Sequence, residues 1–369
     1  MKRGLLAIAA LVGLLMANLL IGSVSIPAIE VWNALSGGEV TKESWRYIVM
    51  ESRVPQTITA TLCGASLAVS GLLLQTTFRN PLAGPSILGI TNGASVGVAI
   101  VMLITGGIIS WGSGDNSQSS ILNIQFIGSI AVVIGAFIGS LLIIFLLLAV
   151  SSVIKNSIML LIVGIMVSYL ASSIVMLLNI FANADNIHTY VMWGMGSFSD
   201  VTLRQLPFFS VVSIIGLVLA ILLIKPLNAL LLGEGYATNL GIKTQRVRRW
   251  LLITTGILTA TATAYCGPVA FIGLAVPHIA RLIVRTSDHT VLLPATMLCG
   301  ASIALLCNII CQLPENMIIP LNAVTPIFGA PVIIYIIFRK RYKERSRERS
   351  IIVITQTKTA HYHSEVASR

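Results

Sequence analysis

The sequence predicts an all-α integral membrane protein with about ten transmembrane helices. Of its 369 residues, 56% are hydrophobic and only 10% are charged, whereas soluble globular proteins carry about 25% charged residues. Long stretches such as 116–154 and 250–280 contain no Asp, Glu, Lys or Arg, and a bilayer crossing needs roughly 20 apolar residues. Because these stretches lack the alternation of barrel strands, we expect helices.

Ten apolar segments are expected to form helices. They lie near residues 4–22, 55–77, 86–106, 124–150, 157–181, 204–225, 249–266, 269–285, 291–312 and 321–338. The first has a basic start, as a signal peptide would, but its apolar run of about 18 residues without a small-x-small cleavage site favours a retained helix. Pro277 should kink or break the eighth helix.

The distribution of Lys and Arg predicts the orientation. With a cytoplasmic N-terminus and ten crossings, 20 of the 24 Lys and Arg residues fall on the cytoplasmic side, leaving Lys42, Arg46, Arg53 and Arg204 outside. We therefore expect a multi-pass protein of the bacterial inner membrane with both termini cytoplasmic. Membrane insertion and anionic lipids account for the net charge of +11 without nucleic acid as a partner.

The chain divides into a membrane domain over 1–338 and a basic cytoplasmic tail over 339–369. The external loop 23–53 should contain a short amphipathic helix that begins near Ile29 and ends at Gly37. Residues 107–123 should form a polar loop, and 182–203 a short re-entrant or surface helix. On the cytoplasmic side, residues 226–248 should carry a short helix from Glu234 to Leu240.

The sequence carries none of the motifs for hydrolysis or ion coupling. It has no Gly-x-x-x-x-Gly-Lys-Ser/Thr phosphate loop, no His-Glu-x-x-His and no paired carboxylates within a helix core. We expect the five cysteines to pack as small buried residues. Hence no catalytic residue, cofactor or metal site is expected, and energy for transport should come from a partner. The alternative is an ion-coupled secondary transporter, which usually needs an ionisable group in the membrane; His278 is the one candidate.

A seven-residue pattern, Leu-Cys-Gly-Ala-Ser-x-Ala, occurs at 62–68 and again at 298–304. Its small residues are spaced so that helices can approach closely. An internal duplication and chance similarity both explain it.

Several motifs together resemble those of the FecCD-type permeases, which import iron-siderophores, haem and cobalamin. Residues 227–241 read Leu-Asn-Ala-Leu-Leu-Leu-Gly-Glu-x-x-Ala-x-x-Leu-Gly, similar to the coupling loop of that family. Residues 79–83 read Arg-Asn-Pro-Leu-Ala, and 271–281 read Phe-Ile-Gly-Leu-x-x-Pro-His-x-x-Arg. The resemblance extends from about residue 53 to 335.

This resemblance implies the permease architecture of a type II ABC importer. Its subunits form a homodimer that works by alternating access with two cytoplasmic ATP-binding subunits and a periplasmic substrate-binding protein. The residues expected to couple to the ATPase are Leu232, Gly233, Glu234, Ala237, Leu240 and Gly241. A gate is expected at Asn156 and Ser157, with a helix cap as the alternative.

Other family positions have structural interpretations. Arg79, Asn80 and Pro81 are expected to cap a turn at the cytoplasmic face. In the motif of Pro277, His278 and Arg281, the histidine at the helix break is expected to bind a nearby carbonyl rather than a ligand.

The sequence also departs from the family where a binding protein docks. Gln56, Asn308 and Gln312 stand where relatives usually have Arg, Asp and Arg. External arginines in this family receive acidic side chains of the binding protein. Docking is therefore expected to depend on Arg53, whose side chain should point outward, with Lys42, Arg46 and Arg204.

Overall fold

The computed structural model describes residues 2–104, 118–154, 156–313, 319–335 and 338, and this part of the chain folds as helices joined by turns. The helices, with their bounds, are α1 (Lys2–Leu20), α2 (Ala28–Ser36), α3 (Glu43–Tyr47), α4 (Val54–Phe78), α5 (Ile90–Ala99), α7 (Gln118–Val153), α8 (Ser157–Phe181), α9 (Ala184–Gly194), α10 (Leu206–Leu222), α11 (Ile224–Leu231), α12 (Glu234–Asn239), α13 (Thr244–Cys266), α14 (Ile272–Val284) and α15 (His289–Gln312). A further apolar helix covers Leu321–Tyr335.

Each of the ten expected helices has a counterpart, so the all-α membrane fold is confirmed. In the described residues, four helices are long and apolar enough to cross a bilayer, and the pair α10–α11, bent by 49°, makes a fifth. Four shorter apolar helices and the threonine-rich α13 account for the others. The tail 339–369 lies outside the described residues.

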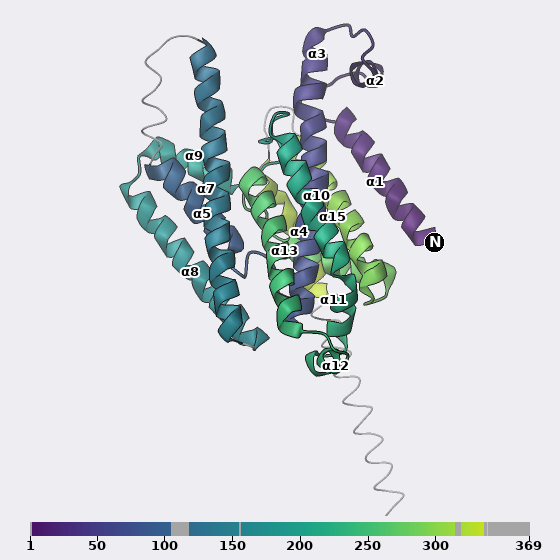
Figure 1. The fold of residues 1–369 in the computed structure, drawn as a ribbon. Coiled ribbons are helices and arrows are strands. Elements are labelled where there is room, and N and C mark those ends of the chain that lie inside the picture. The colour runs from purple at the N-terminus through teal and green to yellow at the C-terminus, as the bar shows by residue number, and fades with distance from the viewer. Residues whose placement is uncertain (1, 105–117, 155, 314–318, 336–337, 339–369) are drawn as a thin grey trace, which may run out of the picture.

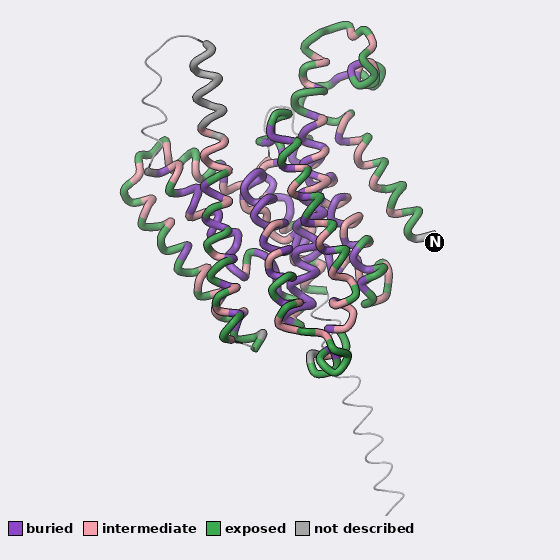
Figure 2. Tube along the Cα trace, viewed as in Figure 1, coloured by how far each residue is buried: buried purple, intermediate pink, exposed green. Residues whose placement is uncertain are grey.

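Helix α4 forms the axis of the bundle (Figure 1), and α10, α13, α14 and α15 all pack against it. Most of its side chains are buried, whereas α1 and α8 lie at the periphery and expose apolar side chains along much of their length (Figure 2). Such exposure suits helices that face lipid or another subunit rather than water.

The two copies of the seven-residue pattern lie face to face between α4 and α15. A Cβ added to Gly64 would collide with the carbonyl of Gly300 and lie 2.5 Å from the Ala304 Cβ, while one added to Gly300 would lie 2.6 Å from the Ala68 Cβ. The pattern therefore brings the backbones of these two helices into direct contact.

Several boundaries differ from the sequence prediction. The short helix in the loop 23–53 is confirmed as α2, and it ends at Gly37 in the left-handed conformation. However, α3 and a π-helical turn, Ile48–Arg53, run directly into α4. Residues 43–53 are thus helix, not loop, because nothing between them breaks the backbone hydrogen bonding. Similarly, α7 begins at Gln118 within the loop predicted for 107–123, whose remaining residues 107–117 lie outside the described part.

The third and eighth helices both begin later than predicted. Asn80 and Gly89, the latter with a φ of 78°, keep the chain in turns until Ile90. Phe271, with a φ of 64°, delays the start of α14 until Ile272. Helix α14 then runs through Pro277 to Val284 without ending there.

Candidate functional site

A hairpin of two short helices, α11 and α12, closes one end of the bundle (Figure 1). The connection is made at Gly233, whose φ of 123° is a conformation that favours glycine. Ala237 of α12 is fully buried and belongs to the same apolar cluster as Leu227 and Leu230 of α11. The predicted short helix is confirmed, with Asn239 as its last residue.

The outer face of the hairpin is apolar although it is exposed. Leu232 is 66% exposed, Tyr236 53% and Leu240 58%. Exposed apolar residues that gather on one small element typically mark an interaction surface. Leu232 and Leu240 were predicted as coupling residues, whereas Tyr236 was missed because the family motif leaves that position unspecified. Glu234 is the first residue of α12, and the structure describes its backbone.

The hairpin is attached to the bundle through Asn228 of α11. Its side-chain oxygen accepts hydrogen bonds from the backbone N–H of His289 at 2.8 Å and lies 2.8 Å from His289 Nδ1. Its amide nitrogen donates to the Asp288 carboxylate at 2.6 Å. The other ring nitrogen of His289 lies 2.9 Å from the Thr76 hydroxyl of α4. A single chain of hydrogen bonds therefore joins α11, α15 and α4.

A second attachment comes from Arg79, which ends α4 with a φ of 47° and donates to the Leu230 carbonyl at 3.2 Å. The predicted turn at 79–81 is confirmed, because the Asn80 side chain accepts from the Leu82 N–H at 2.9 Å. The end of α4 is thus fixed to the hairpin by both a side chain and a tight turn.

The Pro-His motif of α14 completes this junction. His278 Nε2 lies 2.7 Å from the Pro81 carbonyl, so the prediction that this histidine is satisfied by a carbonyl is confirmed. Arg281 donates to Gln75 Oε1 at 2.8 Å, and Gln75 donates to the Leu274 carbonyl at 3.0 Å. We call the contacts of Gln75, Thr76, Arg79, Asn228, His278, Arg281 and His289 the hairpin junction.

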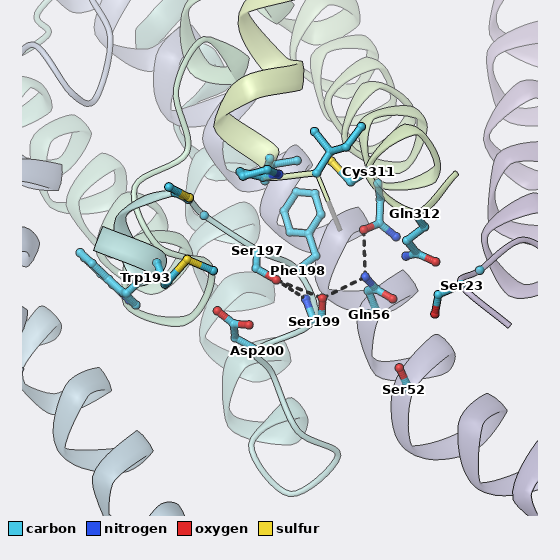
Figure 3. A pocket seen from close by; sticks show the side chains of 18 of the residues that line it. Ser23, Ser52, Gln56, Trp193, Ser197, Phe198, Ser199, Asp200, Cys311 and Gln312 are labelled. Atoms are coloured by element: carbon cyan, nitrogen blue, oxygen red, sulfur yellow. Dashed lines mark hydrogen bonds between the residues drawn. The ribbon is translucent and has the colours of Figure 1, made fainter. Parts of the chain in front are cut away.

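The structure also contains a cavity of about 540 Å³ at the opposite end of α4 (Figure 3). Its wall comes from the α1–α2 connection, the π-helical turn and first residues of α4, and Met102 after α5. The rest comes from α9 with the segment after it, the end of α15 and residues 319–321. Among the described residues that line the cavity, Arg53 and Asp200 are charged. The cavity could not be predicted from the sequence, because the segments that line it are far apart in the chain.

The base of the cavity is a ladder of uncharged side chains. Gln56 donates to Asn308 at 3.1 Å and to the Ser199 hydroxyl at 3.2 Å. Asn308 in turn donates to Asn18 of α1 at 2.7 Å, and Asn18 donates to the Leu305 carbonyl at 3.1 Å. Gln56 and Asn308, two of the departures from the family pattern, are therefore partners of each other, and this amide ladder joins α1, α4 and α15.

The prediction that Arg53 points outward is wrong. Its side chain is only 3% exposed, and its guanidinium donates to the carbonyls of Leu19 at 2.8 Å and Leu20 at 2.9 Å, and to that of Val24. These carbonyls lie at and beyond the C-terminal end of α1, where they have no partner within the helix. Arg53 therefore caps α1 and is not available to an acidic partner.

The other predicted docking cations are exposed or partly exposed. Lys42 lies over the Trp45 ring at 5.0 Å. Arg46 pairs with Glu43 at 3.5 Å and donates to the Gly38 carbonyl at 2.5 Å. Arg204 is exposed between α9 and α10. A docking role for these three residues stays a prediction.

The predicted gate residues lie at the start of α8. Asn156 is exposed, and its side chain accepts from the N–H groups of Ile158 at 2.8 Å and Met159 at 3.3 Å. It is thus the N-cap of α8, which was the alternative interpretation. Of Ser157, only the backbone at the start of α8 is described. A gating role for both residues stays a prediction.

The chain is similar to known transport proteins along most of its length. The model of the FecCD transport family matches residues 9–339. The vitamin B12 import system permease protein BtuC of Klebsiella pneumoniae is 34% identical over 330 residues, covering 89% of this chain and 92% of that protein. The Escherichia coli O9:H4 protein of the same name is 33% identical over 320 residues, covering 86% of this chain and 91% of that protein. A solved structure described as a metal-chelate type ABC transporter, in an inward-facing conformation, has 28% identity and a TM-score of 0.75, covering 90% of this chain and 97% of that chain.

Proposed function

The chain belongs to the FecCD transport family, and from this premise we propose that its α11–α12 hairpin binds an ATP-binding subunit while its homodimer imports a bulky metal chelate or tetrapyrrole. That it is the membrane-spanning permease subunit of an ABC importer follows from the family and the relatives. Such a permease is not itself an enzyme; it works with ATP-binding subunits and a substrate-binding protein.

The observation that carries the proposal is the exposed apolar face of the hairpin. Leu232, Tyr236 and Leu240 are each more than half exposed, while Asn228 and Arg79 hold the elements beneath them to α4 and α15. A partner that moves this surface would therefore move the ends of the bundle helices as well. The hairpin end is accordingly the cytoplasmic one, and the cavity end faces the periplasm.

The substrate class is inferred from the relatives. Two of them import vitamin B12, and one solved neighbour is of the metal-chelate type. We infer that this permease carries cobalamin, haem or an iron-siderophore. The substrate path would lie where two subunits meet, and α8 is suited to that interface because Met166, Tyr169 and Met176 are all exposed along it.

The proposal is tested by co-purification. The permease is expressed with the ATP-binding subunit that supports uptake through it, and Leu240→Asp and Tyr236→Ala are compared with Asn239→Ala, an exposed polar position on the same helix. We expect the first two variants to lose the ATP-binding subunit and the third to retain it. Retention by all three variants would exclude the hairpin as the binding surface.

A further inference from the structure

The cavity opposite the hairpin ends inside the subunit. The amide ladder of Gln56, Asn308 and Asn18 closes its base. Gly64 lies eight residues after Gln56 in α4, and Gly300 lies eight residues before Asn308 in α15, which is about 12 Å along each helix. There the two glycines bring the α4 and α15 backbones into direct contact. At that level the contact between the two backbones leaves no room for a solute between α4 and α15. The cavity is therefore suited to an inserted group that stays, not to a substrate that passes through.

The charge that this cavity presents is negative. Of the charged residues that line it in the described part of the chain, Arg53 is buried and its guanidinium is occupied by three backbone carbonyls. Asp200 is exposed, and the groups in the described residues that act on its carboxylate are the desolvating cavity wall and the Ser197 hydroxyl, with no basic group among them. Ser197, Ser199 and Gln312 add only uncharged hydrogen-bonding groups (Figure 3).

The surroundings of Asp200 favour a cation with an apolar stem. Desolvation by the cavity wall raises the pKa of Asp200, although the Ser197 hydroxyl acts in the opposite direction. A carboxylate in such a place gains more from a basic partner than one fully in water does. Met102, Met192 and Met195 also line the cavity, and thioether side chains pack well along the methylene stem of Lys or Arg.

We propose that this cavity is the docking pocket for a lysine or arginine side chain of the external substrate-binding protein, with Asp200 as its ion-pair partner. This docking proposal rests on the proposed function in one respect, because that function places the cavity end of the bundle outside the cell. It reverses the polarity expected from the family, in which the permease supplies the cations. The uncharged pair of Gln56 and Asn308 is consistent with this reversal, because neither residue offers a positive charge to an acidic side chain.

The first experiment measures how tightly the permease–ATPase complex in nanodiscs binds the substrate-binding protein that supports its uptake, across a salt series. Asp200→Asn should weaken binding about three- to tenfold at low salt and less at high salt, and Asp200→Lys should weaken it further. Asp185→Asn, which removes an exposed carboxylate from α9 outside the cavity wall, should bind like the parent. Unchanged affinity for Asp200→Asn at every salt concentration, or tighter binding by Asp200→Lys, would overturn the proposal.

A second experiment measures the cavity potential without the binding protein. Ser199→Cys places a thiol next to Asp200, and its reaction rates with cationic and anionic methanethiosulfonate reagents are compared. The cationic reagent should react faster, and adding Asp200→Asn should reduce the ratio about threefold or more. A preference for the anionic reagent in the presence of Asp200 would show a positive cavity and overturn the proposal.

The outcomes separate this proposal from the proposed function. If the ATP-binding subunit fails to recognise the hairpin, the proposed function fails. The docking proposal alone is wrong if the ATP-binding subunit does bind the hairpin but Asp200→Asn leaves the affinity for the binding protein unchanged. If that variant then changes only the concentration dependence of substrate uptake, Asp200 contacts the substrate instead.

Discussion

Gly64 and Gly300 are each other's nearest neighbours across the α4–α15 interface. A Cβ added to either residue would collide with the carbonyl oxygen of the other and lie within 2.6 Å of Ala304 or Ala68. The two copies of one short sequence pattern therefore make a nearly reciprocal contact at the centre of the bundle. The contact explains why the pattern has glycine at its third position in both copies.

The first prediction is that Gly64→Ala and Gly300→Ala each destabilise the protein. Overpacking costs about 1–3 kcal/mol, and more where the obstacle is backbone, as it is at both positions. The melting temperature in detergent should fall for both variants. Gly13→Ala in α1 is the control, because an added Cβ there meets nothing within 4 Å. Equal melting temperatures for the three variants would contradict the close contact.

The second prediction is that Arg53 stabilises the folded protein and does not bind the substrate-binding protein. Arg53→Ala leaves the carbonyls of Leu19, Leu20 and Val24 without their donor, at a cost of about 2–4 kcal/mol. Arg53→Lys should recover only part of this, because an ammonium lacks the forked donors of a guanidinium. Thermal unfolding in detergent is the measurement.

The control for Arg53 is Lys42→Ala, which removes a nearby cation that stacks on Trp45 and should change stability little. A loss of binding-protein affinity without loss of stability in Arg53→Ala would restore the docking role that the sequence suggested.

The third prediction concerns the hairpin junction. Asn228→Ala removes the acceptor of two His289 hydrogen bonds and a donor to Asp288, so we expect a loss of about 1–3 kcal/mol and less transport per ATP hydrolysed. Asn228→Asp keeps the acceptor but repels Asp288, so its effect should be intermediate. Asn239→Ala is the exposed control.

The same substitution has a titration readout. Hydrogen bonds from Thr290, together with the Asn228 amide, hold the pKa of Asp288 below its ordinary value. Asn228→Ala should therefore raise the pKa of Asp288 toward that value, which carboxyl NMR can follow. An unchanged pKa and unchanged coupling would show that Asn228 does not link the hairpin to α15.

The sequence predicts the helices and the local turns but not the contacts between segments that are distant in the chain. The helices follow from long uncharged runs, and the proline before His278 predicted a carbonyl partner for this histidine but not that the carbonyl belongs to Pro81, 197 residues away. Thr76, Asn228 and His289, by contrast, meet only because α4, α11 and α15 end at one place. The prediction for Arg53 is wrong for the same reason. Pro55 fixes where α4 starts, but nothing local reveals that the end of α1 lies beside it.

The fourth prediction concerns Asn156 at the start of α8. If α8 lines the interface of a homodimer, Asn156→Cys should form a crosslink between subunits in the nucleotide state that closes the inner gate. Losing the N-cap should cost only about 1 kcal/mol, so the variant should still fold. Glu39→Cys, between α2 and α3, serves as a control for random collision. Absence of a crosslink in every nucleotide state would place both the gate and the interface elsewhere.

The last prediction is that Glu234→Lys separates membrane insertion from coupling. Glu234 is the first residue of α12, where the N–H groups of the first turn favour a negative charge over a positive one. A lysine there also adds positive charge beside Leu232 and Tyr236, the exposed apolar side chains proposed to enter the ATP-binding subunit. Insertion should be normal, because the hairpin lies beyond the end of α10, whereas ATPase binding or its stimulation should be lost. Glu234→Gln, which removes the charge without reversing it, should be milder than Glu234→Lys. ATPase activity of the purified complex and uptake into proteoliposomes are the measurements. Unchanged uptake together with unchanged ATPase stimulation in Glu234→Lys would rule out coupling through the start of α12.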